Sequence, residues 1–159
     1  MNFIIILSII ILLILVVFQD FKMRQIHVLL PILLLFLSVM INYIFEELSF
    51  KDTIYNIGFI AVNIIGLSLY FSIKNKKFIN PIDESIGLGD ILFFLAITPL
   101  FTLKPFIVFF VVSLLLTLLF YSIVNAIKKT STIPLAGYLS IFLMAFLIIR
   151  DVFKIIQTY

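Results

Sequence analysis

Two aspartates at the ends of apolar segments are the residues of this chain whose type and spacing could do chemistry. Asp90 ends the sequence Gly-Leu-Gly-Asp at 87–90, directly before an apolar run, and Asp20 ends the first apolar run. Acidic side chains beside or inside lipid-spanning helices are costly, and they commonly mark function. Two carboxylates on one side of a membrane bundle are the minimum equipment of an aspartyl protease.

Peptide hydrolysis by such a pair needs one carboxylate as general base, to activate a water, and one carboxylic acid, to polarise the peptide carbonyl. Neighbouring carboxylates in a medium of low dielectric constant do not both ionise readily, so the pair holds one proton near the working pH. That proton belongs to the pair, which leaves open which acid is the base. Gly87 and Gly89 lack Cβ atoms, and we expect them to let an extended substrate approach Asp90 closely.

Each of these features also has an ordinary structural interpretation. Asp90 would make a good N-cap for the following helix, and Asp20 could be an interfacial acid near Lys22 and Arg24. The Pro-Leu-Ala-Gly sequence at 134–137 could simply begin the last helix, because proline suits a first turn. The functional interpretation is favoured because both acids lie at helix ends on one expected face.

The elements that must position these residues are apolar helices. Of the 159 residues, 64% are hydrophobic and only 12% are charged, whereas globular chains are about half apolar and a quarter charged. A lipid-spanning helix needs about 20 mostly apolar residues. The apolar runs are 3–19, 26–45, 54–73, 90–103, 105–127 and 133–149. We therefore expect an all-α bundle of six transmembrane helices in a single domain, 1–159.

Two of the runs need a closer look. The first has no positively charged start and no small-residue cleavage site, so we expect a retained transmembrane helix and not a cleaved signal peptide. The run at 90–103 is too short to span a bilayer unaided, and Pro99 interrupts it. Either its helix begins earlier, within 78–89, or its neighbours shield it from lipid.

Basic residues are unevenly shared between the two sides of the expected bundle. One side carries Lys22, Arg24, Lys74, Lys76, Lys77, Lys128 and Lys129. The other side carries Lys51, Lys104, Arg150 and Lys154. Because cytoplasmic loops hold an excess of Lys and Arg, we expect both termini outside the cytoplasm. Asp20 and Asp90 would then both lie at the cytoplasmic face.

The composition excludes several kinds of chemistry. Cysteine is absent and there is one histidine, so thiol nucleophiles and Cys-based zinc sites are excluded, and we expect no metal and no cofactor. The net charge of +3 needs no nucleic-acid partner, because membrane proteins keep Lys and Arg at their cytoplasmic ends.

Three segments resemble the type IV prepilin peptidases, the bacterial and archaeal GxGD membrane aspartyl proteases. The motif at 87–90 matches GxGD in full. The segment 20–26, Asp-Phe-Lys-Met-Arg-Gln-Ile, is similar to the family's Asp at a helix end followed by a basic loop. The segment 133–139, Ile-Pro-Leu-Ala-Gly-Tyr-Leu, is similar to the proline-containing segment that opens the family's last helix. The number of apolar runs, six, and the spacing of about seventy residues between the two acids are also similar to those of the compact members of the family.

The chain departs from the family pattern in three places. His27 and Val28 stand where the family usually has Pro-Asn, and Gly137 replaces a common second proline. The cysteine-rich, N-methylating portion of the larger enzymes is absent. The chain therefore resembles the short, peptidase-only branch that serves tight-adherence pili or archaella, and we expect no N-methyltransferase activity.

The resemblance implies an endopeptidase of the cell membrane, multi-pass, that removes the short basic leader of a prepilin-like precursor at the cytoplasmic face. The acids Asp83 and Glu84 could attract that leader. The resemblance assigns catalysis to Asp20 and Asp90. It assigns contact with the substrate to Gly87, Gly89, Pro134 and Gly137.

Two other functions remain open, and so does the oligomeric state. A non-enzymatic assembly factor for a pilus or secretion machine would be a degenerate member of the same family. A proton-coupled transporter would need polar residues along a path inside the membrane. The candidates for that path are Asn42, Asn63, Ser68, Ser113 and Thr117.

Overall fold

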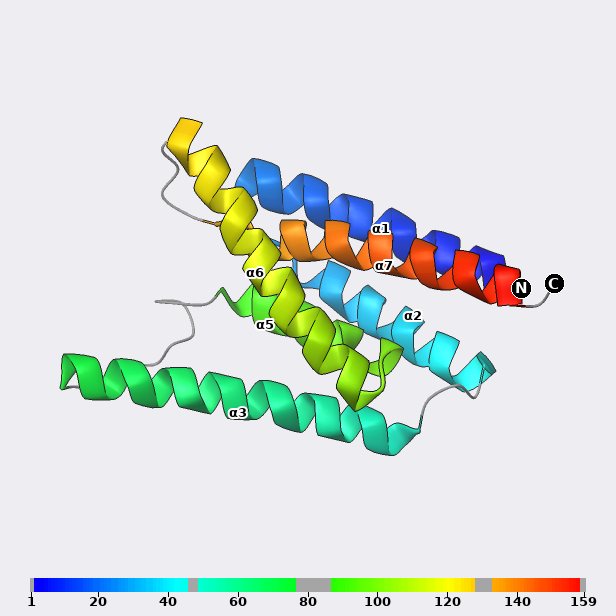
Figure 1. The fold of residues 1–159 in the computed structure, drawn as a ribbon, viewed down its shortest axis with the longest axis horizontal. Helices are drawn as coiled ribbons and strands as arrows, with labels where there is room; N and C mark the ends of the chain where they lie inside the picture. Colours follow the sequence, from blue (N-terminus) through cyan, green and yellow to red (C-terminus); the bar gives the residue numbers. More distant parts are fainter. Residues whose placement is uncertain (1, 46–48, 77–86, 128–132, 158–159) are drawn as a thin grey trace.

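The protein is all-helical over the residues that the computed structural model describes, which are 2–45, 49–76, 87–127 and 133–157. Six α-helices and one short 3-10 helix make up this part of the chain (Figure 1). Their bounds are α1 Asn2–Met23, α2 Leu29–Phe45, α3 Phe50–Asn75, α5 Leu88–Ile97, η1 Thr98–Leu100, α6 Leu103–Ile127 and α7 Leu135–Gln157. The six helices overlap the six apolar runs, so the all-α prediction is confirmed.

Three of these helices, and not six, are long and apolar enough to cross a membrane. They are α1 over Ile4–Met23, α3, and α6 over Leu103–Ala126. The apolar parts of the other three helices are shorter. By this measure three of the six expected transmembrane helices are supported as spans among the described residues. The apolar part of α7 is short because it ends at the charged Arg150. The α-helix of α5 is short because the proline in η1 interrupts it.

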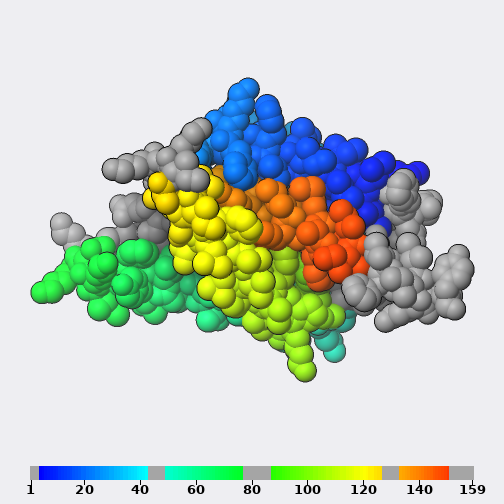
Figure 2. Space-filling view, turned by 45° about the horizontal axis from the view of Figure 1, so that its top comes forward, coloured from blue at the N-terminus to red at the C-terminus, as the bar shows by residue number. Residues whose placement is uncertain are grey.

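The helices run back and forth between two ends of the molecule (Figure 1). α1 and α7 lie side by side in opposite directions, and α2 packs against α1 and α5. Figure 2 shows α1, α7 and α6 on one face, with α3 along the edge. This alternation brings the end of α1 and the beginnings of α5 and α7 to the same end of the molecule.

α5 lies in the middle of this arrangement, against α2, α3 and α7. Its side chains Phe93, Phe94, Ala96 and Ile97 are all buried. Both possibilities for this short run find support, because α5 begins at Leu88, two residues before the run, and its neighbours bury much of it. The stretch 78–86 lies outside the described residues.

A buried asparagine holds the point where α5 breaks. Pro99 ends the α-helical turn, and the chain passes through η1 before α6 begins. Asn56 of α3 is fully buried, and its Nδ2 donates to Thr98 O at 3.0 Å and to Phe101 O at 2.7 Å. A side chain of α3 thus satisfies two carbonyls that the broken helix leaves without helical partners.

Phenylalanine side chains fill the core beside this break. Their rings contact one another with centroid separations from 4.8 to 6.4 Å and link α3, α5, α6 and α7. The members of this phenylalanine cluster are Phe59, Phe94, Phe101, Phe106, Phe109, Phe110 and Phe146. Offset and edge-on ring pairs of this kind add about 0.5–1.5 kcal/mol each beyond their buried area. The cluster therefore fixes where α5 lies among its neighbours.

Candidate active site

Asp20 lies on the last turn of α1 with only 5% of its surface exposed. Its Oδ2 accepts a hydrogen bond of 2.6 Å from the backbone N–H of Gly137 in α7. An interfacial acid that served only to balance Lys22 and Arg24 would have no need of this burial. The structure therefore favours the interpretation that Asp20 belongs to a site held in place by specific contacts and is not an ordinary interfacial acid.

Asp90 is the third residue of α5, and its carboxylate joins two elements. The N-cap of this helix is Gly87, so the alternative that made Asp90 the N-cap is wrong. The Asp90 N–H donates to Gly87 O at 3.0 Å, and the Asp90 carboxylate folds back toward Gly87, where a Cβ would lie 3.2 Å from Oδ2. Asp90 Oδ1 also accepts a hydrogen bond of 3.1 Å from Ala136 N of α7.

The two acids meet at the first turn of α7. Consecutive backbone N–H groups, those of Ala136 and Gly137, bind Asp90 and Asp20 respectively. The carboxylates are close enough for the charge of Asp20 to act on Asp90. Residues separated by about seventy positions in the sequence are thus held as a pair by two neighbouring donors.

The start of α7 explains why these donors are available. The helix begins at Leu135, directly after the buried Pro134, and Tyr138 N donates to Pro134 O at 3.2 Å. The first four N–H groups of a helix have no partner within it, and Ala136 and Gly137 are the second and third residues. The positive end of the helix dipole also faces the acids, which favours negative charge there.

The glycines of the GxGD motif contact the protein's own residues in this structure. A Cβ at Gly87 would lie 3.2 Å from Asp90 Oδ2, so this glycine allows the carboxylate to fold back onto the helix start. A Cβ at Gly89 would meet Ile26 at 3.4 Å, which is an ordinary van der Waals distance. Their contact with substrate stays a prediction.

Several residues that support the site carry no signal that a motif search would find. Gln19 Oε1 accepts a hydrogen bond of 3.0 Å from His27 N, which ties the end of α1 to the loop before α2. Arg24 adopts a left-handed φ of 56°, and its N–H donates to Asp20 O at 3.0 Å, which ends the helix. The donor at Ala136 was missed because it is a backbone group, and only the neighbouring proline hinted at a helix start there.

Two further expectations concern the acidic pair of the 74–89 connection and metal ligands, and only the described residues bear on them. Asp83 and Glu84 lie outside them. Within the described part of the chain, no three His, Cys, Asp or Glu residues gather as metal ligands would.

Three of the five candidates for a proton path bond within their own helices. Asn63 Nδ2 donates to Phe59 O at 2.8 Å, Ser113 Oγ to Phe110 O at 3.1 Å, and Thr117 Oγ1 to Ser113 O at 2.8 Å. Side chains that satisfy their own helix in this way leave their polar atoms turned toward the backbone. These three residues give the transporter reading no support.

Comparison of the chain with models of known families, with curated proteins and with solved structures finds no match. The likeness to prepilin peptidases therefore depends on the three short segments named above.

Proposed function

We propose that this chain is a membrane-embedded aspartyl endopeptidase in which Asp20 and Asp90 are the catalytic pair. The observation that supports the proposal most strongly is the binding of both carboxylates by consecutive N–H groups at the start of α7. A pair of acids that served only as two helix caps would not need to meet.

In the proposed reaction the pair holds one proton. The ionised acid takes a proton from a water molecule, whose oxygen attacks the peptide carbonyl carbon, while the other acid gives its proton to the carbonyl oxygen. Collapse of the tetrahedral intermediate breaks the C–N bond: the leaving nitrogen takes up a proton from one acid, and a hydroxyl of the intermediate returns its proton to the other, so the pair again holds one proton. The N–H groups of Ala136 and Gly137 each use one carboxylate oxygen, which fixes the directions of both acids.

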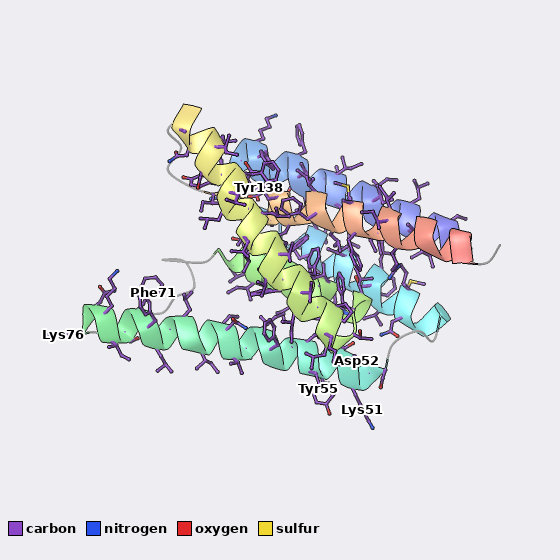
Figure 3. All side chains as sticks on the ribbon, viewed as in Figure 1. Lys51, Asp52, Tyr55, Phe71, Lys76 and Tyr138 are labelled. Atoms are coloured by element: carbon purple, nitrogen blue, oxygen red, sulfur yellow. The ribbon has the colours of Figure 1, made fainter. Side chains whose placement is uncertain are left out.

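We place the six helices in the cell membrane as a multi-pass bundle with both termini outside. α1, α3 and α6 would cross it unaided, and α2, with 17 residues, is at the lower limit of about 17–25 for a span. α5 would stay enclosed by its neighbours. Lys76 lies at the end of α3 that reaches the side of the two acids, and Lys51 lies at the opposite end (Figure 3).

The proposed substrate is a prepilin-like precursor with a short basic leader ahead of an apolar helix, as the family resemblance implies. Its leader would approach the acids from the cytoplasm. The proposal requires neither a nucleic acid nor a cofactor.

The test is cleavage of such a substrate by the purified chain in detergent or lipid. Asp20→Asn and Asp90→Asn should each abolish turnover without loss of folding, as measured by thermal unfolding. Asp52→Asn is the matched control, because Asp52 is an acid at the far end of α3, and it should keep wild-type turnover (Figure 3).

Each outcome separates the candidate functions. Turnover that survives either active-site substitution contradicts the proposed pair. A folded wild type that cleaves none of several prepilin-like substrates would favour the non-enzymatic assembly factor.

A further inference from the structure

Gly137 is a point of tight packing between α1 and α7. Its N–H binds Asp20, and a Cβ at this position would lie 3.2 Å from Asp20 Oδ2 and 2.7 Å from both Cδ2 and Cε2 of Phe21. The second distance is shorter than real Cβ contacts allow. No described glycine has a positive φ, so position 137 requires glycine for space and not for backbone conformation.

Phe21 is held against Gly137 by the next residue of α7. Its ring meets the ring of Tyr138 edge-on, with centroids 5.0 Å apart and planes at 67°. Tyr138 is itself buried and stacks on Phe120 of α6 at 6.4 Å. The Phe21 ring therefore cannot move away from Gly137 without losing its contact with Tyr138, although Phe21 is 40% exposed.

We propose that Phe21 and Gly137 form a size-matched pair that positions the Asp20 carboxylate. The Phe21 ring packs on Gly137, which has no side chain, and this contact sets the separation between the end of α1 and the start of α7. Because Asp20 directly precedes Phe21 on the same helix, that separation also sets the distance from Asp20 to its N–H donor.

The contact between Phe21 and Gly137 acts on the reaction through the position of Asp20, whose Oδ2 the Gly137 N–H binds. A methyl group at position 137 displaces the ring, lifts the end of α1 and lengthens the Asp20–Gly137 hydrogen bond. A displacement of about 1 Å in a catalytic group can cost about 100-fold in rate. A loss of this kind appears in kcat, whereas KM changes little, because the Phe21 ring, and not the expected substrate, occupies the space beside the buried Gly137.

The kinetic test of this inference rests on the proposed peptidase activity and uses Gly137→Ala, Phe21→Ala and the double variant. Gly137→Ala should lower kcat about 100-fold with KM within about threefold of wild type. Adding Phe21→Ala removes the ring atoms that lie 2.7 Å from the new methyl group and leaves only the milder approach of 3.2 Å to Asp20 Oδ2, so the double variant should recover at least about tenfold of that loss. Gly66→Ala is the matched control, because nothing lies within 4 Å of a Cβ there, and it should leave kcat unchanged.

A second measurement needs no activity. Carbodiimide modification of Asp20, followed by mass spectrometry, reports how well its carboxylate is covered and bound. Gly137→Ala should raise the rate of modification, and the double variant should return it toward the wild-type rate.

The outcomes keep the two proposals apart. If wild type cleaves but the double variant is no better than Gly137→Ala in either measurement, the size-matched pair is wrong and the peptidase stands. If wild type does not cleave but the modification rates follow the expected pattern, the peptidase is wrong and the pair stands. If Gly137→Ala does not fold, the double variant must fold, and its failure to do so overturns the pair.

Discussion

At the scale of single residues, the site depends on backbone groups as much as on side chains. Both acids are bound by backbone N–H groups, which substitution of Ala136 or Gly137 by any residue other than proline leaves in place. A buried donor that loses its acceptor costs about 1–3 kcal/mol, whereas an isosteric acceptor keeps the bond. Loss of charge and loss of the hydrogen bond can therefore be separated experimentally at Asp20.

Asp20→Asn and Asp20→Ala should differ in stability although both abolish cleavage. The asparagine side chain keeps an oxygen that accepts from Gly137 N, so Asp20→Asn should unfold near the wild-type temperature. Asp20→Ala leaves that N–H unpaired and should lose about 1–3 kcal/mol of unfolding free energy. Thermal unfolding of both variants in one detergent checks this, and equal midpoints would contradict the role of the hydrogen bond.

Gly89→Ala should separate the fold from the proposed reaction. A Cβ at this position meets Ile26 at an ordinary contact distance, and alanine within a helix is favoured over glycine by about 1 kcal/mol. We expect unchanged or slightly raised thermal stability. If Gly89 admits an extended substrate beside Asp90, kcat/KM should fall about tenfold or more. Unchanged cleavage would remove Gly89 from the substrate site.

At the scale of elements, the sequence predicted where the helices lie along the chain but not how they pack against one another. The apolar runs predicted where each helix lies, and the GxGD sequence predicted an acid at the start of α5. The enclosure of α5 depends on Asn56 and on rings from three other helices, which no local pattern shows. The meeting of the acids depends on orphan N–H groups of α7, which any helix start would have.

Asn56→Leu should remove the hydrogen bonds that join α3 to the helix break after α5. The substitution leaves the carbonyls of Thr98 and Phe101 without their donor in apolar surroundings, so we expect a loss of about 2–4 kcal/mol of unfolding free energy. Asn63→Leu, on the same helix, is the control. Its side chain is exposed and bonds only its own helix, so its loss should be below about 1 kcal/mol. Similar losses at both positions would contradict a special role for Asn56.

At the scale of the whole molecule, charge and helix direction predict one orientation in the membrane. The described residues Lys22, Arg24, Lys74 and Lys76 lie at the end of the molecule that holds the acids. The positive-inside rule then directs that end to the cytoplasm. The charges, and not the packing, set this orientation, because a bundle has the same internal contacts whichever way it is inserted in the membrane.

The absence of cysteine makes the orientation directly testable. Lys51→Cys and Lys76→Cys place one thiol at each end of α3, and both positions are exposed. A membrane-impermeant thiol reagent applied to intact cells should label Lys51→Cys and leave Lys76→Cys unlabelled until the cells are opened. The reverse pattern would put the acids on the outer side and exclude a cytoplasmic leader as substrate.

The position of the donors in the chain has a consequence for biosynthesis. A ribosome makes Asp20 first, Asp90 second and the N–H groups of Ala136 and Gly137 last, so a growing chain carries both acids before it carries the groups that orient them. Until α7 joins α1, the half-made protein lacks the two N–H groups that hold the carboxylates together as a pair. The proposed enzyme would therefore be inactive during its own insertion, at the stage when other nascent membrane helices surround it.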